Sequence, residues 1–329
     1  MKKYLFLIGI VIFGLIAIIV YTNDFAMTIN EDTVKFKDRR IAIEYSETKS
    51  SPKKPGLILF IHGDGPVNKN SDEGYYPAWE TLAEENIISV SWDKPGVGNS
   101  TGNWLEQDME DRKDEAERVL KWALDNYDVD PNRVGVWGSS QGGWVITKLL
   151  NNNTDIKFAI GVAPAVNWMR QGKFNTVSEM EYEGYSSKEI NKRLSIESKV
   201  NDYLNQNDYQ GYLNSKLEQD IIEKDRWDFI RKNMGLDNTK ELAKIKKPYY
   251  LIVGDHDINV DTKETEEVYQ KHITKEYLTI YNIKNATHRM LKTRHQKDNV
   301  MTVGESIFNP REIFAPGYLK ALKDIGKKL

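Results

Sequence analysis

A serine between glycines is the part of this chain whose residue types most directly predict chemistry. Ser140 lies in the segment Gly138-Ser139-Ser140-Gln141-Gly142-Gly143, which has the pattern G-x-S-x-G. An apolar run (133–137) precedes the segment and a helix-like run (144–150) follows it, so the pattern falls at a strand-to-helix turn. Such a turn strains the backbone and exposes the serine hydroxyl, while neighbouring glycines avoid collisions of Cβ atoms. Ser140 is therefore a candidate nucleophile.

The residue after the serine could complete the site. Gln141 lies where the helix begins, so its backbone N–H lacks an intrahelical partner and can bind a developing oxyanion. Taken alone, the motif also fits a glycine-rich turn without chemistry. The rest of the chain has to separate the two interpretations, because a hydroxyl is a weak nucleophile until a base removes its proton.

Candidates for that base and for an orienting acid follow two later strand-like runs. Asp255 and Asp257 follow the apolar run 249–253, and His288 follows the run 277–283. Together with Ser140 they give the order serine, aspartate, histidine, each residue just after a predicted strand. This order predicts a triad in which a carboxylate holds the imidazole that activates the hydroxyl.

Of the two aspartates, Asp257 is the predicted acid. Asp261 and Glu264 resemble a capping box at the start of the next helix, which places Asp257 midway along a loop that can bend toward His288. Asp255 lies closer to the strand, and we expect its side chain to satisfy local backbone N–H groups.

Two further loops follow buried strands. The continuous apolar run 57–61 ends in His62-Gly63-Asp64-Gly65-Pro66, at the edge of the sheet where ligands bind in α/β proteins. We expect the ring of His62 to hold this turn rather than to act in catalysis. The run 87–92 leads into Asp93-Lys94-Pro95-Gly96-Val97-Gly98-Asn99-Ser100. Its glycines look like a phosphate cradle, but no Gly-Lys-Ser/Thr follows, so nucleotide binding is not expected.

The surrounding elements predict how these residues are positioned. Residues 33–36 and 41–45 alternate polar and apolar side chains and predict an antiparallel pair of strands at a sheet edge. Buried strands then alternate with helices, which predicts a mostly parallel sheet with right-handed crossovers. The predicted helices cover 75–85, 106–127, 144–150, 262–272 and 316–329. Residues 292–310 are expected to be irregular.

Residues 167–246 interrupt this alternation and are too many for a loop. They are rich in Glu, Lys, Asn and Tyr, with helical stretches around 187–203 and 217–234. We interpret them as a helical cap over the carboxyl ends of the strands; a solvated excursion away from the site is the alternative. The expected organisation is an N-terminal segment (1–27), a first core part (28–166), the cap (167–246) and a second core part (247–329).

The N-terminal segment predicts a location. Lys2 and Lys3 precede an apolar run from residue 4 to residue 21, roughly 27 Å long as a helix. We expect an uncleaved transmembrane anchor, because no small-x-small cleavage site follows the run; a cleaved signal peptide and secretion are the alternative. Acidic residues follow the run, so the positive-inside rule places the catalytic domain outside the cytoplasm and makes the membrane a partner.

Composition excludes several other functions. The net charge of the 329 residues is −3, and the positive residues form no long stripe, so nucleic acid is not an expected partner. The chain has no cysteine, which excludes disulfides and thiolate metal sites. Asp255, His256 and Asp257 could bind a metal by composition, but adjacent residues on one turn rarely converge on an ion. No cofactor is expected.

These motifs together resemble those of the α/β-hydrolase superfamily, over about residues 57–329. They are most similar to bacterial serine esterases that carry an H-G-S-G-P turn and a D-K-R-G-V-G-K-S loop. The resemblance implies an α/β-hydrolase fold, with Ser140 as nucleophile, His288 as general base and then acid, and Asp257 as the orienting acid. It also implies an oxyanion hole made by the backbone N–H groups of Asp64 and Gln141.

Two departures from this pattern concern substrate preference. Asp64 replaces a small neutral residue, and Pro95 and Asn99 replace two basic ones. Because a carboxylate in an oxyanion hole would repel the developing charge, we expect the Asp64 side chain to turn away; the alternative is that it meets a positive group on the substrate.

The expected function is hydrolysis of carboxylic esters through an acyl-enzyme, with a small-molecule ester or other acyl compound as the substrate. A peptidase or thioesterase with the same triad is one alternative. The other is a binding protein that keeps the fold without catalysis.

Overall fold

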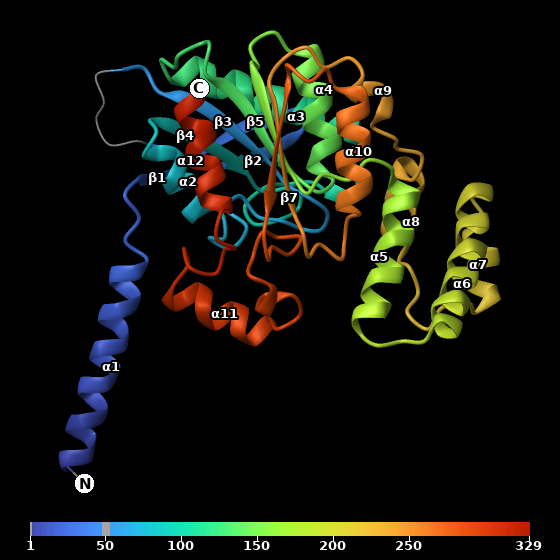
Figure 1. Cartoon of the computed structure of the whole chain (residues 1–329), viewed down its shortest axis with the longest axis horizontal. Helices are drawn as coiled ribbons and strands as arrows, with labels where there is room; N and C mark the ends of the chain where they lie inside the picture. The colour runs from blue at the N-terminus through green and yellow to red at the C-terminus, as the bar shows by residue number, and fades with distance from the viewer. Residues whose placement is uncertain (1, 48–52) are drawn as a thin grey trace.

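The computed structural model describes residues 2–47 and 53–329 and has an eight-stranded sheet at its centre (Figure 1). The strands lie in the order β1-β2-β4-β3-β5-β6-β7-β8. β1 pairs antiparallel with β2, and β2 antiparallel with β4, while all other neighbours are parallel. The strands are β1 (Thr28–Phe36), β2 (Arg39–Glu47), β3 (Gly56–Ile61), β4 (Ile87–Trp92), β5 (Val134–Ser139), β6 (Phe158–Val162), β7 (Tyr249–Gly254) and β8 (Leu278–Ile283).

Helices cover both faces of the sheet. They are α1 (Lys2–Thr22), α2 (Tyr76–Ala83), α3 (Met109–Asn126), α4 (Gly142–Asn152), α5 (Trp168–Tyr182), α6 (Ser187–Gln206), α7 (Tyr209–Ser215), α8 (Lys224–Asn233), α9 (Thr239–Leu242), α10 (Thr262–His272), α11 (Asn299–Phe308) and α12 (Tyr318–Lys328), with short 3-10 helices η1 (Trp104–Glu106) and η2 (Thr293–His295).

The alternation of side chains along the strands produces two cores. Leu57 and Leu59 of β3 pack with α3, α4 and α10, whereas Ile58 and Phe60 pack with α2 and α12. All four side chains are fully buried. Burial on both faces explains why these strands are continuous apolar runs, and it confirms the predicted mostly parallel sheet flanked by helices.

One predicted irregular region is helical. Residues 292–310 contain η2 and α11, so the expectation of an irregular segment was wrong. The carboxylate of Asp298 accepts a hydrogen bond from the backbone N–H of Met301 and caps α11. Valine, threonine and glycine inside α11 have low helix propensity, so the helix could not be predicted from the local sequence.

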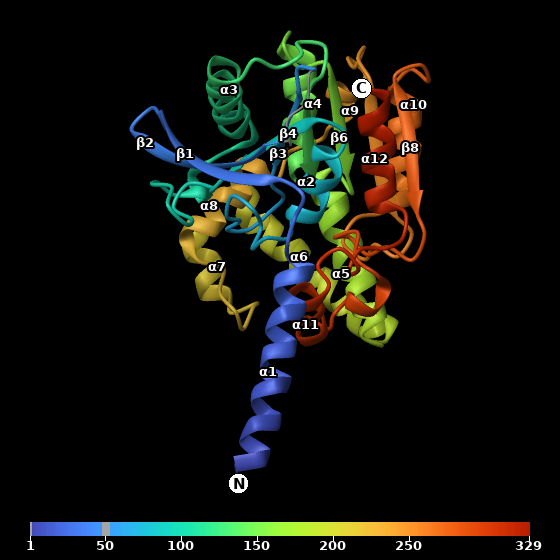
Figure 2. The same ribbon diagram turned by 90° about the vertical axis from the view of Figure 1, so that its left-hand side faces the viewer.

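The predicted N-terminal helix exists as α1, which extends away from the body beside α11 (Figure 2). The expectation that it spans a membrane is not supported: within the described ranges, no helix is both long and apolar enough to cross a bilayer. The segment after α1 is docked on the body. Arg311 donates to the carbonyls of Thr22 and Asp24, and its guanidinium lies 4.4 Å from the ring centre of Phe25.

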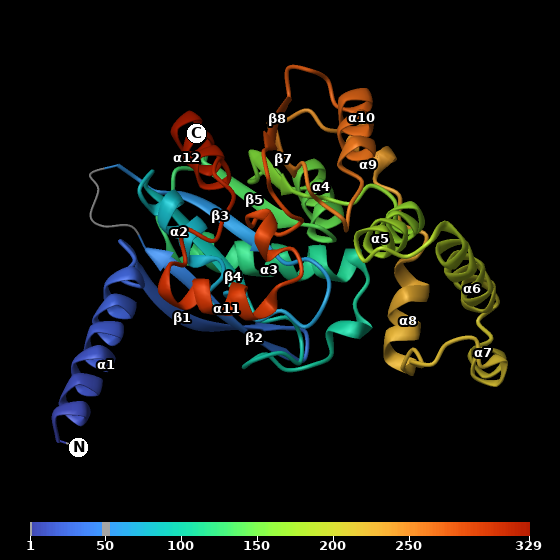
Figure 3. The same cartoon turned by 60° about the horizontal axis from the view of Figure 1, so that its bottom comes forward.

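The insertion of residues 167–246 forms helices α5 to α9, of which α5 to α8 extend from one side of the body (Figure 3). α5 was missed by the sequence analysis, because it has no clear apolar stripe and none of its residues is fully buried. α8 contacts η1, and Phe229 of α8 packs edge-on against Trp104 at 5.2 Å between ring centres. The rest of the insertion has its own small core around Trp227, Tyr212 and Leu204.

Candidate active site

The turn between β5 and α4 holds Ser140 in a strained conformation. Its φ angle is +50°, in the left-handed region that non-glycine residues rarely adopt. Tight packing around the turn holds Ser140 in this strained conformation. A Cβ atom on Gly142 would lie 2.5 Å from the carbonyl oxygen of Ile61, and one on Gly143 would lie 2.5 Å from Pro164. The glycines are therefore required for the close approach of α4 to the sheet, as predicted.

Gln141 is the N-cap residue of α4. Its side chain makes no capping bond, and its backbone N–H has no acceptor among the residues that the structure describes. An unpaired N–H beside Ser140 is the geometry that binding an oxyanion needs.

Asp257 and His288 are brought together at the carboxyl ends of β7 and β8. Nδ1 of His288 lies 2.7 Å from Oδ2 of Asp257, whose side chain is fully buried. The other carboxylate oxygen accepts hydrogen bonds from the backbone N–H groups of Asn259 and Val260. Since the carboxylate is the acceptor, Nδ1 carries the proton and Nε2 is free to accept one.

Asp255 has a different environment. Its carboxylate pairs with His256 at 2.7 Å and accepts a hydrogen bond from the backbone N–H of Ala286. These contacts agree with the predicted role in the turn. The expected capping box is half present: Asp261 caps α10 by accepting from the N–H of Glu264, while the Glu264 side chain pairs with Arg170 of α5 instead.

Ser140 lies at the same edge of the sheet as the Asp257–His288 pair. Its N–H bonds to the carbonyl of Val162 at the end of β6, and Ala163 in turn bonds to Ile252 of β7. No hydrogen bond joins Ser140 to His288 within the described residues. Catalytic hydrogen bonds are often longer in an unliganded enzyme and tighten when substrate binds.

The turn after β3 faces the serine. A Cβ atom on Gly63 would lie 3.3 Å from Cβ of Ser140, so the backbone of this turn touches Ser140. His62 is buried behind it, with Nε2 2.6 Å from the carbonyl oxygen of Trp92 and Nδ1 2.9 Å from the hydroxyl of Tyr75. Burial lowers the pKa of His62 to about 3. His62 is thus a neutral structural residue, as the sequence analysis expected.

The side chain of Asp64 turns toward the insertion. Arg226 of α8 binds its two carboxylate oxygens at 2.9 and 2.6 Å. Burial opposes ionisation of this carboxyl, but the hydrogen bonds and charge of Arg226 outweigh it and lower the pKa of Asp64. The protein itself therefore supplies the positive group that Asp64 meets.

Three cations around this turn were not identified from the sequence. Lys94 and Arg112 are buried and bind carbonyl oxygens of the turn, and Arg226 binds Asp64. Lys94 lies in the loop after β4 that the sequence analysis singled out for its glycines. Arg112 and Arg226 lie on helices among many other charged residues, where no local pattern distinguishes them.

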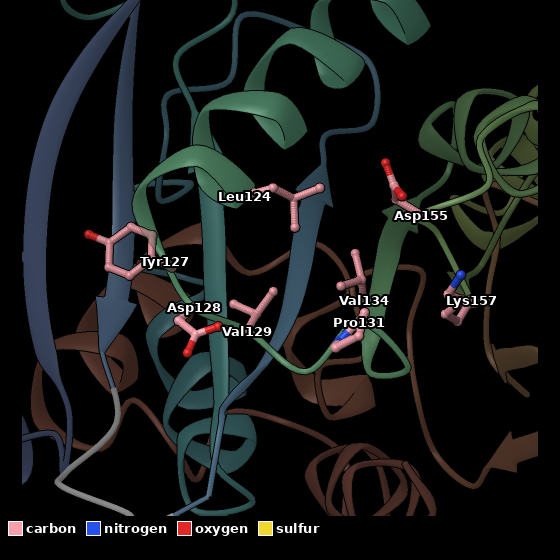
Figure 4. Close-up of a pocket in the computed structure, with 8 residues that line it drawn as sticks. All are labelled: Leu124, Tyr127, Asp128, Val129, Pro131, Val134, Asp155 and Lys157. Atoms are coloured by element: carbon pink, nitrogen blue, oxygen red, sulfur yellow. The ribbon is translucent and has the colours of Figure 1, made fainter.

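A cavity of about 210 Å³ lies at the other end of the sheet and is not part of this site. It is lined by Val134, the first residue of β5, together with Tyr127, Asp155 and Lys157 (Figure 4). Ser140 follows the last residue of the same strand, roughly 20 Å away at 3.3 Å per residue. Across the described ranges, no group of three or more His, Asp or Glu side chains is arranged to hold a metal ion.

Solved structures with a similar fold include esterases. An esterase from Pyrococcus furiosus is 19% identical, has a TM-score of 0.55, and the match covers 88% of this chain and 92% of that protein. Est1E from Butyrivibrio proteoclasticus, solved with ferulic acid bound, is 16% identical with a TM-score of 0.54 over 84% of this chain and 96% of its own. These likenesses show that the chain has an α/β-hydrolase fold.

Curated relatives with detectable sequence similarity are dipeptidyl peptidases. A probable dipeptidyl-aminopeptidase B from Penicillium rubens is 27% identical over 164 residues, and a dipeptidyl peptidase 4 from Bos taurus is 30% identical over 125 residues. The matches cover 45% and 35% of this chain but only 16% of each relative. The model of the "Prolyl oligopeptidase family" matches residues 78–304, well over half of the chain and the whole stretch from α2 through Ser140, Asp257 and His288. On that match, together with the fold and the strained serine turn, this protein belongs to the prolyl oligopeptidase family of serine hydrolases.

Proposed function

We propose that this serine hydrolase cleaves carboxylic esters through an acyl-enzyme formed on Ser140. The observation that carries the proposal is the buried Asp257–His288 pair, which lies at the same sheet edge as the strained Ser140 turn. A hydroxyl becomes a strong nucleophile when a correctly oriented imidazole removes its proton. The fold shared with esterases supports an ester as the substrate.

In the proposed reaction, Nε2 of His288 accepts the proton of the Ser140 hydroxyl as the oxygen attacks the carbonyl carbon. The same imidazole then protonates the leaving alcohol, and the acyl group stays on the serine. Water attacks this acyl-enzyme with His288 again as the base, which releases the acid and restores the serine. Asp257 keeps the proton on Nδ1 and stabilises the imidazolium that forms.

The backbone N–H groups of Asp64 and Gln141 are proposed to hold the oxyanion. Both lack an acceptor in the part of the chain that the structure describes. Gln141 follows Ser140 in the sequence, and Gly63, the residue before Asp64, lies against Ser140. Preorganised donors of this kind stabilise charge where it develops in the transition state.

A peptidase is the second candidate, and a specific observation favours it. The chain belongs to a peptidase family, and the curated relatives it matches are named as dipeptidyl peptidases. The same triad can cleave peptides or thioesters, because each reaction transfers an acyl group to the serine. A fold that binds ligands without catalysis is the third possibility.

A fluorophosphonate probe together with a substrate panel tests these possibilities. We expect the wild-type protein to be labelled and to hydrolyse short acyl esters faster than dipeptidyl amides or thioesters. Ser140→Ala should abolish labelling and lower kcat by on the order of 10⁴ or more, and His288→Ala should behave alike. The adjacent Ser139→Ala is the matched control and should keep both activities.

The outcomes are distinct. Preferential cleavage of dipeptidyl amides would establish the peptidase instead of the esterase. If the wild type reacts neither with the probe nor with any substrate, the result would favour a binding protein that keeps the fold without catalysis. Ser140→Ala activity within tenfold of wild type would contradict the assignment of the nucleophile.

The location of the protein stays a prediction. Lys2 and Lys3 before the apolar run 4–21, and acidic residues after it, favour a catalytic body outside the cytoplasm. Its association with a membrane through the N-terminal segment and its release after cleavage are both compatible with this sequence pattern. Fractionation of expressing cells, with mass measurement of the mature N-terminus, separates the two.

A further inference from the structure

We propose that Lys94 is a positioning residue of the oxyanion hole, which fixes the peptide between Gly63 and Asp64 so that its N–H faces the substrate. The inference rests on the proposed function, because it concerns how the same hydrolytic site is assembled. Lys94 would not touch the reacting atoms; it would act through the backbone of the turn after β3.

Three carbonyl oxygens of this turn bind buried cations. Nζ of Lys94 lies 2.6 Å from the carbonyl oxygen of Gly63 and 2.7 Å from that of Gly65. The guanidinium of Arg112 donates to the preceding carbonyl, that of His62. The carbonyl side of the turn is therefore fixed by charge-assisted hydrogen bonds, which are stronger than neutral ones.

A fixed carbonyl also fixes the direction of the N–H group in the same peptide unit. The carbonyl of Gly63 and the N–H of Asp64 belong to one peptide unit, and in a planar trans peptide they point in opposite directions. When the carbonyl is bound to Lys94, the N–H must point away from Lys94. A flipped peptide would instead present the carbonyl oxygen to the oxyanion and repel it.

The other side of the turn is the side of the nucleophile. A Cβ atom that replaced one Cα hydrogen of Gly63 would lie against Cβ of Ser140. The N–H of Asp64 has no acceptor in the described ranges, so it stays available to a substrate. Arg226 holds the Asp64 carboxylate at the insertion, which keeps the negative side chain from competing for the same N–H.

Lys94 is costly to bury, and this cost argues for a role beyond stability. The residue is only 4% exposed, and among the described residues it forms no ion pair with a carboxylate. Burial, reinforced by the nearby Arg112, lowers the pKa of Lys94 well below its usual range. The ring of Trp104, 4.9 Å from Nζ, is the remaining favourable contact. An apolar side chain of similar shape would fill this site at lower cost.

The test compares Lys94→Met with Lys247→Met in the full chain. Lys247 is a matched control, because its Nζ also donates to two backbone carbonyls, those of Asn153 and Ile156, each at 2.8 Å, at the opposite end of the sheet. We expect Lys94→Met to lower kcat for an ester by about 10²-fold with little change in KM, as for loss of one oxyanion-hole donor. Its thermal midpoint should equal or exceed that of wild type, whereas Lys247→Met should keep kcat within about twofold.

A chemical variant keeps the proposal testable if Lys94→Met does not fold. The chain has no cysteine, so Lys94→Cys introduces a unique thiol. Alkylation during refolding with bromoethylamine restores a lysine-like amine, and bromopropane gives a neutral side chain of similar length; wild type treated alike is the reference. We expect the amine to raise kcat at least tenfold over the propyl form.

Equal kcat for the two alkylated forms, or a Lys94→Met kcat within about threefold of wild type, would overturn the role of Lys94. These outcomes differ from failure of the proposed function, in which wild type itself would neither react with the fluorophosphonate probe nor hydrolyse an ester.

Discussion

The carboxyl edge of the sheet and the insertion of residues 167–246 differ in what holds their polar side chains. At the sheet edge, the Asp257 carboxylate is fully buried and receives hydrogen bonds from two backbone N–H groups and from His288. One polar contact of the insertion with the core, the Asp64–Arg226 pair, lies nearer the surface, and its side chains are 39% and 34% exposed. Water weakens pairs of the second kind.

Helix α8 shows where the boundary between the two regions lies. Phe229 is buried in the main core, whereas Trp227, two residues earlier on the same helix, is buried in the small core of the insertion. α8 therefore belongs to both regions, and α6 and α7 belong to the outer one alone. The comparison teaches that chemistry should depend on the sheet edge and the inner face of α8, and little on the outer helices.

The largest expected effect distinguishes two acids at the sheet edge. Asp257→Asn should lower kcat by about 10³- to 10⁴-fold, because an amide favours the wrong imidazole tautomer. Asp255→Asn, the matched control on the same turn, should lower stability slightly and keep kcat within about fivefold. Steady-state ester kinetics measure both. The reverse order would show that the acid has been assigned to the wrong aspartate.

Acid should destabilise the sheet edge through His62. The pKa of this histidine is lowered from 6.5 to about 3 by burial, so between these values the unfolded chain binds a proton that the folded protein does not. The contribution of the neutral ring to the free energy of unfolding is complete above pH 6.5. This contribution is lost as the pH falls toward 3, by up to about 4 kcal/mol.

Urea unfolding from pH 7 to pH 4 measures this loss. A His62→Asn variant should be less stable at pH 7 but should show a shallower decline. An unchanged slope in the variant would mean that other groups cause the acid sensitivity.

The two aromatic residues of α8 test the boundary within the insertion. Phe229→Ala and Trp227→Ala should each lower the free energy of unfolding by about 3 kcal/mol, in the region where the original side chain packs. This is the cost expected for large-to-small changes in a core. Phe229→Ala should also lower kcat/KM several-fold, because it loosens the helix that carries Arg226.

Trp227→Ala should instead speed hydrogen exchange in α6 and α7 and leave kcat/KM within about twofold. Hydrogen exchange by mass spectrometry together with ester kinetics gives both readouts. Equal losses of activity in the two variants would remove the distinction between inner and outer parts of the insertion.

The smallest effect is expected for Asp64→Asn. The pair with Arg226 is partly exposed and is worth at most about 1 kcal/mol, so kcat/KM on neutral esters should change by no more than about threefold. A selective loss on substrates that carry an amine, measured against neutral esters of equal size, would show that Asp64 binds substrate and would favour the peptidase.

Local sequence patterns were sufficient to predict the order of the core elements and the three candidate triad residues. Period-two and period-3.6 patterns, and glycines at a strand-to-helix turn, are local properties, and these predicted the sheet, its flanking helices and the Ser140 turn. Asp257 could be distinguished from Asp255 because the helix cap at Asp261, four residues after Asp257, limits where each carboxylate can lie. Local patterns failed where they are weak: α5 has no apolar stripe, and α11 is built from poor helix formers.

The charged residues around the candidate site could not be identified before the loops and helices were placed in space. Arg226 meets Asp64 across 162 positions of sequence, and Lys94 meets Gly63 across 31. A solvated and a buried lysine or arginine cannot be told apart in the sequence, because no periodic pattern identifies the group that the buried side chain contacts. The difference arises when the loops after β3 and β4 and helix α8 converge on one edge of the sheet, because burial there gives these cations backbone carbonyls and one carboxylate as partners in place of water.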